Sequence, residues 1–194
     1  GEKEQALALF RAAALKSAYI LFPVVVFLFI LADDFMSLLY SSRYLASAYP
    51  FRVLLLLLPF RIVFYGPLFV AMGRPKVVFW RALSGIVMTT LLSLLFARLW
   101  GYMGVAWACV FSVGLYQYGF YLFSFMKMLK IRVGQLLPLK DLGKTLYFLI
   151  PSALCLLFLR IVVLQGSAFS RFLISGVLFW GAVAVWWYRK LFWK

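Results

Sequence analysis

An arginine in the middle of an apolar run is the feature of this sequence that most directly indicates chemistry. Arg61 lies inside FRVLLLLLPFRIVFYGPLFVAMGRPK, residues 51–76, and Arg52 lies nine residues before it. A guanidinium stays charged and presents a planar fork of donors that fits carboxylates and phosphates. On a straight helix Arg61 would lie roughly 16 Å from either end of the apolar run, beyond easy reach of water.

Arginine at the centre of a membrane helix costs about 2.5–3.5 kcal/mol, so it normally faces a cavity, a partner or the interior of a bundle. We therefore interpret Arg61 and Arg52 as candidate anion contacts, and it is open whether the two share one cavity. The alternatives for Arg61 are a structural ion pair with a part of the protein outside this chain, and a boundary of this span that differs from the predicted one. Pro59, between the two arginines, is expected to kink the helix.

Acidic residues are scarce, and the pair Asp33 and Asp34 lies at the outer end of the first expected helix. One interpretation is a cation-coupling site. The others are solvated carboxylates at the outer interface or a cap for the turn that follows. The chain has no histidine, and both cysteines lie inside apolar runs. We therefore expect no metal site and no cofactor, and the sequence offers few groups for acid–base catalysis.

The composition places these residues in a membrane protein. Hydrophobic residues make up 66% of the chain and aromatic residues 20%, and the mean hydropathy is +1.02, whereas soluble globular proteins are about 45–50% apolar. Stretches of roughly 20 apolar residues cross the hydrocarbon core as helices. We predict an all-α integral membrane protein with about six transmembrane helices, at residues 18–40, 50–72, 77–97, 103–126, 143–164 and 171–189.

Short, charged breaks between these spans predict an antiparallel bundle. Fourteen of the 20 Lys and Arg residues fall at the same alternate ends of the spans, which by the positive-inside rule places both ends of this segment in the cytoplasm. The positive charge therefore indicates topology and attraction to anionic lipids rather than nucleic-acid binding. Small residues at every fourth position on 77–97 and 103–126 predict close helix packing, with a polar cavity wall as the alternative.

The predicted organisation has three parts. Residues 1–16 have apolar and basic residues at helical spacing, which favours a cytoplasmic amphipathic segment or the frayed end of a longer helix. Residues 17–130 hold four spans, and residues 131–194 hold a cytoplasmic linker and two additional transmembrane helices. The sequence opens within a helical pattern, so we expect it to be part of a longer protein.

Several ordered features resemble a known transporter family. They are Phe22-Pro23, Leu38-Leu39-Tyr40, Pro59, the segment Ala71-x-Gly73-Arg74-x-Lys76 and GYMGVAWACVFS. Together they resemble the C-terminal lobe of the Wzx-like polysaccharide flippases, in the multidrug/oligosaccharidyl-lipid/polysaccharide exporter superfamily. The resemblance covers residues 1 to about 130, and extends to the last two spans only by hydropathy.

This resemblance implies a flippase of the bacterial inner membrane that moves undecaprenyl-pyrophosphate-linked oligosaccharide by alternating access, for cell-surface polysaccharide biosynthesis. The chain would form most of the C-terminal lobe of a fourteen-helix transporter, and the missing N-terminal lobe would be its partner. Arg61 would hold the pyrophosphate near mid-membrane and Arg52 nearer the outer face, with Arg74 or Lys76 at the cytoplasmic mouth. The acidic pair and a serine at position 41 depart from the family pattern.

Three other classes of function remain open at this point. A multidrug cation exporter of the same superfamily would need acidic residues within its spans. A membrane-embedded enzyme acting on glycan lipids would need a positioned acid or base. An assembly subunit would have Arg61 paired with a partner and no cavity. The sequence favours a transporter that is not an enzyme.

Overall fold

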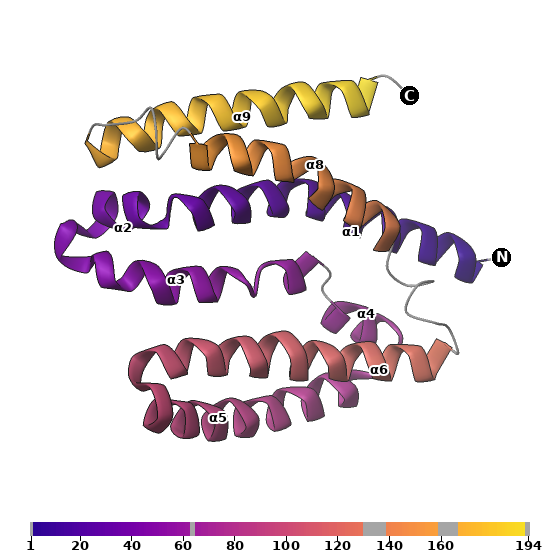
Figure 1. Ribbon diagram of the computed structural model, residues 1–194. Helices are drawn as coiled ribbons and strands as arrows, with labels where there is room; N and C mark the ends of the chain where they lie inside the picture. Colours follow the sequence, from indigo (N-terminus) through magenta and orange to yellow (C-terminus); the bar gives the residue numbers. More distant parts are fainter. Residues whose placement is uncertain (1, 63–64, 130–138, 159–166, 193–194) are drawn as a thin grey trace. The chain divides into compact units, whose positions relative to one another are not determined.

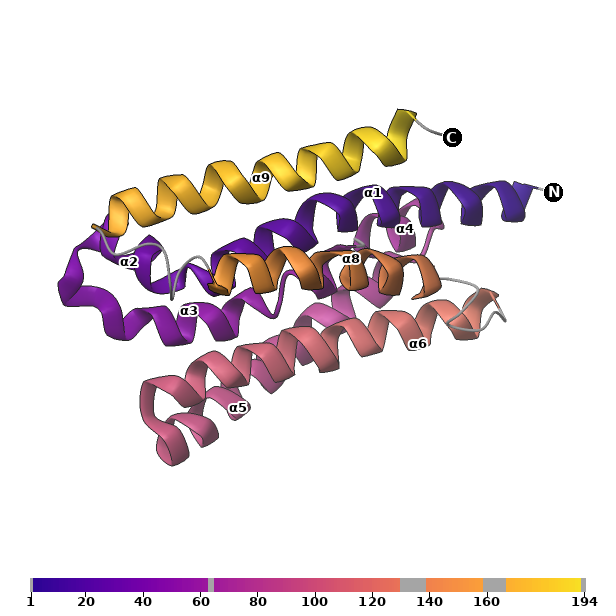
Figure 2. The same ribbon diagram turned by 45° about the horizontal axis from the view of Figure 1, so that its top comes forward.

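The computed structural model describes residues 2–62, 65–129, 139–158 and 167–192, and in those ranges the chain is all-helical (Figures 1 and 2). The elements in chain order are α1 Glu2–Ile30, α2 Ala32–Tyr40, η1 Ser42–Ser47, α3 Ala48–Leu55, η2 Pro59–Ile62, α4 Tyr65–Ala71, α5 Pro75–Cys109, η3 Val110–Gln117, α6 Tyr118–Leu129, α8 Leu139–Phe158 and α9 Ala168–Phe192.

Three helical segments of this fold are long and apolar enough to cross a membrane: Ala8–Ile30, Pro75–Met128 and Ala168–Tyr188. The broken pair Ser42–Leu55 and Pro59–Ala71 makes a fourth if it is one span. The all-helical class is confirmed, and the predicted total of six spans stays a prediction. Of the expected span 143–164, α8 supplies the short apolar helix Leu149–Phe158, and residues 159–164 lie outside the described ranges.

The first predicted span is displaced in the structure. The apolar helix covers Ala8–Ile30 rather than residues 18–40, and α1 runs without a break past residue 16, where the amphipathic segment was expected to end. Leu31 interrupts the helix before α2 begins at Ala32. Pro23 lies inside α1 instead of opening a span.

The described chain divides into two compact units. Unit 1 contains residues 1–21 and 53–142, and unit 2 contains residues 22–52 and 143–194. Each unit is therefore made of two stretches that are distant in the sequence. The three consecutive parts expected from the sequence stay a prediction.

The largest element of unit 1 is a helical hairpin. The segment Pro75–Met128 has 54 residues, which as one straight helix would be about 80 Å long. Trp100 and Gly101 have non-helical backbone angles, with φ +59° at Gly101. The chain reverses there, so that the second arm, through η3 and α6, runs back along α5 in both views (Figures 1 and 2). The arms correspond to the spans expected at 77–97 and 103–126.

Small residues let the two arms of the hairpin approach closely, as the sequence predicts. The hydroxyl of Thr89 contacts that of Ser112 across the interface. A Cβ atom on Gly104 would lie 1.9 Å from the carbonyl oxygen of Phe96. These contacts confirm close packing of the two faces.

A turn between α4 and α5 follows from its local sequence. Gly73 has φ +69°; its N–H donates to the carbonyl of Val70 at 3.0 Å, and the N–H of Arg74 donates to that of Phe69 at 2.8 Å. This pair of bonds is the Schellman motif, which favours glycine at the left-handed position. Pro75 then begins α5, where its missing N–H costs no helical hydrogen bond.

In unit 2, aromatic side chains fix α9 against the other helices. The ring of Phe27 on α1 lies 5.3 Å from that of Phe172 and 5.5 Å from that of Phe179, both on α9. Phe35 on α2 lies 5.9 Å from Phe172 and stacks on Phe51 of α3 at 5.5 Å. Such pairs are worth about 0.5–1.5 kcal/mol each beyond the area they bury.

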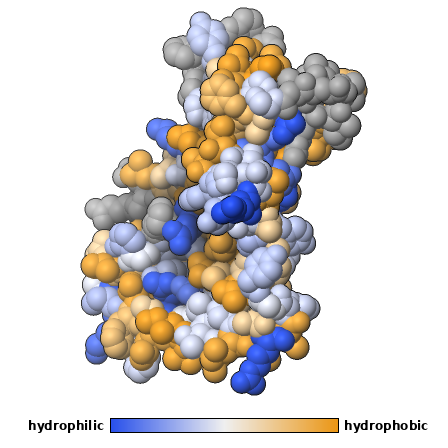
Figure 3. Space-filling view, turned by 90° about the vertical axis from the view of Figure 1, so that its left-hand side faces the viewer, coloured by the Kyte–Doolittle hydropathy of each residue, from blue (hydrophilic) through white to orange (hydrophobic). Residues whose placement is uncertain are grey.

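Large hydrophobic side chains are also exposed. Ile86 is 67% exposed, Phe123 65% and Val177 73%. The face drawn in Figure 3 shows orange hydrophobic side chains interspersed with white and blue ones. Exposed side chains of this size on helices that are long and apolar enough to cross a membrane are consistent with contact with lipid.

Candidate functional site

Arg61 lines a cavity inside unit 1. The cavity has a volume of about 790 Å³ and lies among η2, α4, α5 and the second arm of the hairpin. Its polar lining residues are Arg61, Tyr65, Arg81, Gln117, Tyr118 and Tyr121, and the others are Gly66, Pro67, Val70, Ala71, Val78 and Val113. Two guanidiniums therefore face one cavity whose remaining wall is largely apolar and aromatic.

Pro59 explains how Arg61 comes to line this cavity. Proline lacks an N–H donor, and its ring clashes with the carbonyl of the residue four positions earlier, which here is Leu55. The helix α3 ends at Leu55, and the chain continues through i to i−3 turns into the short helix η2. Arg61 is exposed there. The break expected at Pro59 is therefore present, and the helical segments on its two sides, Ser42–Leu55 and Pro59–Ala71, are bent by 47°. That Arg61 lies near mid-membrane stays a prediction.

Arg81 is the second cation of the cavity. Its Nη1 donates to Oε1 of Gln117, and its guanidinium carbon lies 4.9 Å from the centre of the Tyr121 ring. Its Nε is buried and has no hydrogen-bond partner in the described part of the chain. A cation over an aromatic face and an amide is held in place without losing its charge, so Arg81 still presents a positive charge to the cavity.

Gln117 is positioned by the hairpin. It is the last residue of the π-helical segment η3, and π-helical turns are frequent at functional sites. Gly85 on the opposite arm leaves room for it, because a Cβ atom on Gly85 would lie 2.9 Å from Cδ of Gln117. The amide thus has a fixed location between the two arms.

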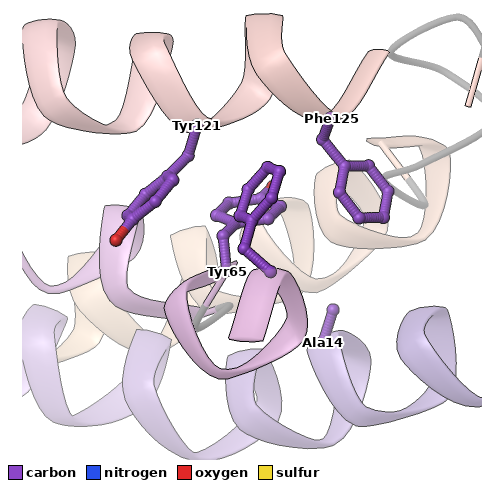
Figure 4. Close-up of a cluster of buried hydrophobic side chains, with 5 residues drawn as sticks. Ala14, Tyr65, Tyr121 and Phe125 are labelled. Atoms are coloured by element: carbon purple, nitrogen blue, oxygen red, sulfur yellow. The ribbon is translucent and has the colours of Figure 1, made fainter. Parts of the chain in front are cut away.

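A cluster of buried rings supports the wall of the cavity. Tyr65 and Phe69 of α4 are 3% and 0% exposed, and they pack with Tyr121 and Phe125 of α6 and Ala14 of α1 (Figure 4). Tyr65 lies 6.1 Å from the ring of Tyr121, and Phe69 stacks on the same ring at 5.6 Å. Because Tyr121 also underlies Arg81, this cluster fixes the platform of the second cation.

Arg52, the other predicted anion contact, belongs to unit 2 and has partners there. Its Nη2 donates to Oδ2 of Asp33 at 2.8 Å, and its Nε donates to the backbone carbonyl of Phe29 at 3.0 Å. The structure therefore assigns Arg52 to an ion pair that joins α3 to α2.

Asp34 forms a second ion pair in unit 2. Nε and Nη2 of Arg171, in the first turn of α9, donate to its Oδ1 at 3.0 and 2.7 Å. Asp34 is only 1% exposed, so the interpretation as a solvated carboxylate is wrong for this residue. The capping interpretation is also wrong, because Leu31 is the N-cap of α2 and makes no side-chain cap bond. Cation coupling by Asp33 and Asp34 stays untested.

Arg74 and Lys76, the predicted mouth residues, lie on either side of Pro75 at the start of α5. Both are exposed. Neither lines the cavity of Arg61 among the residues that the structure describes. Lys76 instead lines a separate groove on the hairpin.

Sequence reasoning missed Arg81 and Gln117. Arg81 is one of the fourteen charges that indicate topology, and Gln117 is not among the residues singled out from the sequence. A signal was present, because Gln117 is an amide near the middle of an apolar span, where polar side chains usually bond across helices. Arg81 and Gln117 line the same cavity as Arg61 because of the hairpin and the break at Pro59, and neither feature can be read from the spacing of these residues in the sequence.

Comparisons with known proteins give no relative: no family model, no curated protein and no solved structure matches the chain. The fold and the site therefore define the class by themselves. The chain is an all-helical protein with three to four long apolar helices that can cross a membrane, and it carries a cavity lined by two arginines.

Proposed function

We propose that this chain is part of a transporter that moves undecaprenyl-pyrophosphate-linked oligosaccharide across the bacterial inner membrane. The observation that carries the proposal is the pairing of Arg61 and Arg81 in one cavity among apolar helices. Of the described residues that line the cavity, none is a carboxylate. Two cations in an apolar setting are costly unless they are paired with opposite charge, so the cavity favours an anionic ligand. A pyrophosphate would supply that charge and accept hydrogen bonds from both guanidiniums.

The size and polarity of the cavity narrow the part of the substrate that it fits. A volume of about 790 Å³ lies within the range of roughly 300–1,000 Å³ for small-ligand sites. It suits a pyrophosphate and its first sugar rather than a whole oligosaccharide. The amide of Gln117 and the tyrosine hydroxyls offer bonds to sugar hydroxyls, and the guanidiniums offer charge-assisted bonds to phosphate oxygens.

We infer that transport proceeds by alternating access, with the cavity as one wall of a path completed outside this chain. Arg52 is not among the residues proposed to contact the substrate, because its guanidinium already donates hydrogen bonds to Asp33 and to the carbonyl of Phe29. A multidrug cation exporter is disfavoured by two guanidiniums in the cavity. An enzyme is disfavoured because its described lining offers tyrosine, glutamine and arginine but none of the usual carboxylate or histidine bases.

The test uses proteoliposomes that contain the whole transporter of which this chain is proposed to be a part. It measures the movement of a fluorescent undecaprenyl-pyrophosphate-linked sugar from one leaflet to the other. Arg61→Leu and Arg81→Leu each remove charge-assisted hydrogen bonds worth about 1.5–3 kcal/mol, so we expect transport to fall about tenfold or more. Lys replacements should retain part of it. Arg98→Leu is the control, because Arg98 is an exposed arginine of α5 outside the described cavity lining.

Protein abundance and elution from a sizing column are measured for every variant. Full transport by both Leu variants at normal abundance would remove the two arginines from the mechanism and refute the proposal. Loss of folded protein in the Leu and Lys variants alike, with Arg98→Leu normal, would support the structural ion-pair interpretation instead.

A further inference from the structure

A second concave feature lies on the hairpin and is independent of the function proposed above. It is a groove of about 440 Å³ lined by Lys76, Val77, Trp80, Ser84, Tyr116, Phe120 and Ser124. Apart from Val77, each arm contributes residues four positions apart, so one stripe of α5 faces one stripe of the returning arm. Because the arms are antiparallel, Lys76 lies opposite Ser124, and Ser84 lies opposite Tyr116.

The groove has a cationic end and an aromatic lining. Lys76 is exposed at its beginning, where Arg74 is exposed as well. Lys127, also exposed, follows Ser124 by three residues on α6 and so lies on the same helix face at the same end. Farther along, the aromatic side chains of Trp80 and Phe120 line the groove. At the other end the hydroxyl of Ser84 donates to the carbonyl of Trp80 at 2.7 Å, and no described residue of the groove lining at that end is charged.

The length of the groove matches one leaflet of a bilayer. Eight residues separate Lys76 from Ser84, which corresponds to about 12 Å along a helix. The hydrocarbon core is about 30 Å thick, so one leaflet is about 15 Å deep. A membrane-spanning helix would need a groove along the whole hydrocarbon core, whereas a lipid tail enters from one side and occupies one leaflet. The length of the groove therefore favours a lipid tail.

The charge pattern identifies the kind of lipid. A cationic end followed by an apolar channel is complementary to a molecule with an anionic head and a hydrocarbon tail. The positive-inside prediction places this end of the hairpin in the cytoplasm, and the cytoplasmic leaflet carries the anionic lipids that attract such clusters. The described residues that line the groove include no acidic side chain that would oppose an anionic headgroup.

We propose that this groove binds one anionic phospholipid, with its phosphate at Lys76 and an acyl chain along Trp80 and Phe120. The lipid would fill the outer seam of the hairpin, on a different set of residues from those that line the cavity of Arg61.

The experiment measures lipids that remain bound to the detergent-purified protein by native mass spectrometry, after mixing with micelles of phosphatidylglycerol or phosphatidylcholine. We expect one phosphatidylglycerol to bind in preference to phosphatidylcholine. Lys76→Gln should weaken its binding about fivefold, which corresponds to ~1 kcal/mol for a cation near the membrane surface. Lys76→Arg should keep it.

Matched controls separate the groove from general surface effects. Trp80→Ala should weaken phosphatidylglycerol binding, and Trp100→Ala should not, although the two side chains are 60% and 58% exposed. Lys16→Gln removes an exposed cation elsewhere in unit 1 and should also have no effect. All of these side chains are exposed, so the variants are expected to fold.

Three results would overturn the proposal. They are equal binding of the two lipids by the wild-type protein, equal loss in the control variants, and binding that is insensitive to both Lys76→Gln and Trp80→Ala. A second polypeptide in the wild-type spectrum that is lost on Trp80→Ala would show that a protein segment fills the groove. Transport by Lys76→Gln is measured in parallel, so that failure of lipid binding is distinguished from failure of the transport proposal.

Discussion

The ion pair between Asp34 and Arg171 allows a quantitative test of how unit 2 is held together. The carboxylate lies in the first turn of α2 and the guanidinium in the first turn of α9. Arg171→Met removes both hydrogen bonds from Arg171 to Asp34 Oδ1 while keeping most of the side chain's apolar length. The carboxylate then stays in a location where it is 1% exposed.

The magnitude follows from the unequal exposure of the two partners. The side chain of Asp34 is 2% exposed and that of Arg171 is 32% exposed. Breaking a buried pair costs about 3–5 kcal/mol when the remaining charge is buried, and the lower end, about 3 kcal/mol, applies to a partner already in part solvated. Asp34→Asn should cost less, about 1–2 kcal/mol, because the remaining guanidinium reaches solvent and the amide still accepts a bond. The double variant Asp34→Leu with Arg171→Leu should recover most of the loss.

The assay is equilibrium unfolding of the purified protein in mixed micelles with increasing dodecyl sulfate, followed by circular dichroism. Arg43→Met is the control, since Arg43 is an exposed arginine of η1 in the same unit. It should change the free energy of unfolding by less than about 0.5 kcal/mol. The reasoning is refuted if Arg171→Met behaves like Arg43→Met, or if the double Leu variant is destabilised as much as Arg171→Met alone.

Two further predictions concern unit 1 and are measured by thermal unfolding in detergent. Phe69→Ala should cost about 3–5 kcal/mol because the side chain is fully buried in its aromatic cluster. Phe79→Ala, at a side chain that is 62% exposed, should change stability little; equal shifts would contradict the described packing. Gly104→Ala should destabilise the hairpin by about 3 kcal/mol, because the new methyl group would meet the backbone of Phe96. Gly119→Ala has open space around it and should stabilise by up to about 1 kcal/mol; a neutral Gly104→Ala would refute the close approach of the arms.

The helical class and the turns between α4 and α5 and within the hairpin were predictable because they depend on local chemistry. Hydropathy over about 20 residues indicates apolar helices whatever they pack against. Gly73 and Pro75 end one helix and begin the next through their own backbone preferences. The hairpin turn likewise includes Gly101, which adopts the positive φ that other residues avoid.

The boundaries of the first helix were not predictable in this way. Hydropathy favoured residues 18–40, but the helix already runs through Ala14 and Ala18, which are buried at 1% and 0% exposure, so this part of α1 is packed instead of lying free on a surface. The helix also breaks at Leu31, inside the predicted span 18–40. Packing of small residues against other helices carries no strong hydropathy signal, and tertiary contacts therefore decided the ends of this helix.

The role of each arginine was the hardest feature to predict, since the residue type and its apolar setting are shared. Arg52 and Arg171 each bond a carboxylate in unit 2, and they hold helices together. Arg61 and Arg81 line a cavity whose described wall has no carboxylate, and Arg81 is held by an amide and a ring instead. The sequence separates Asp34 from Arg171 by 137 positions, so no local pattern shows which guanidinium is compensated. Two guanidiniums that line one cavity repel each other unless an anion joins them, and no described residue of this cavity wall is a carboxylate. This difference in partners is the physical reason to seek a ligand in unit 1 and a structural role in unit 2.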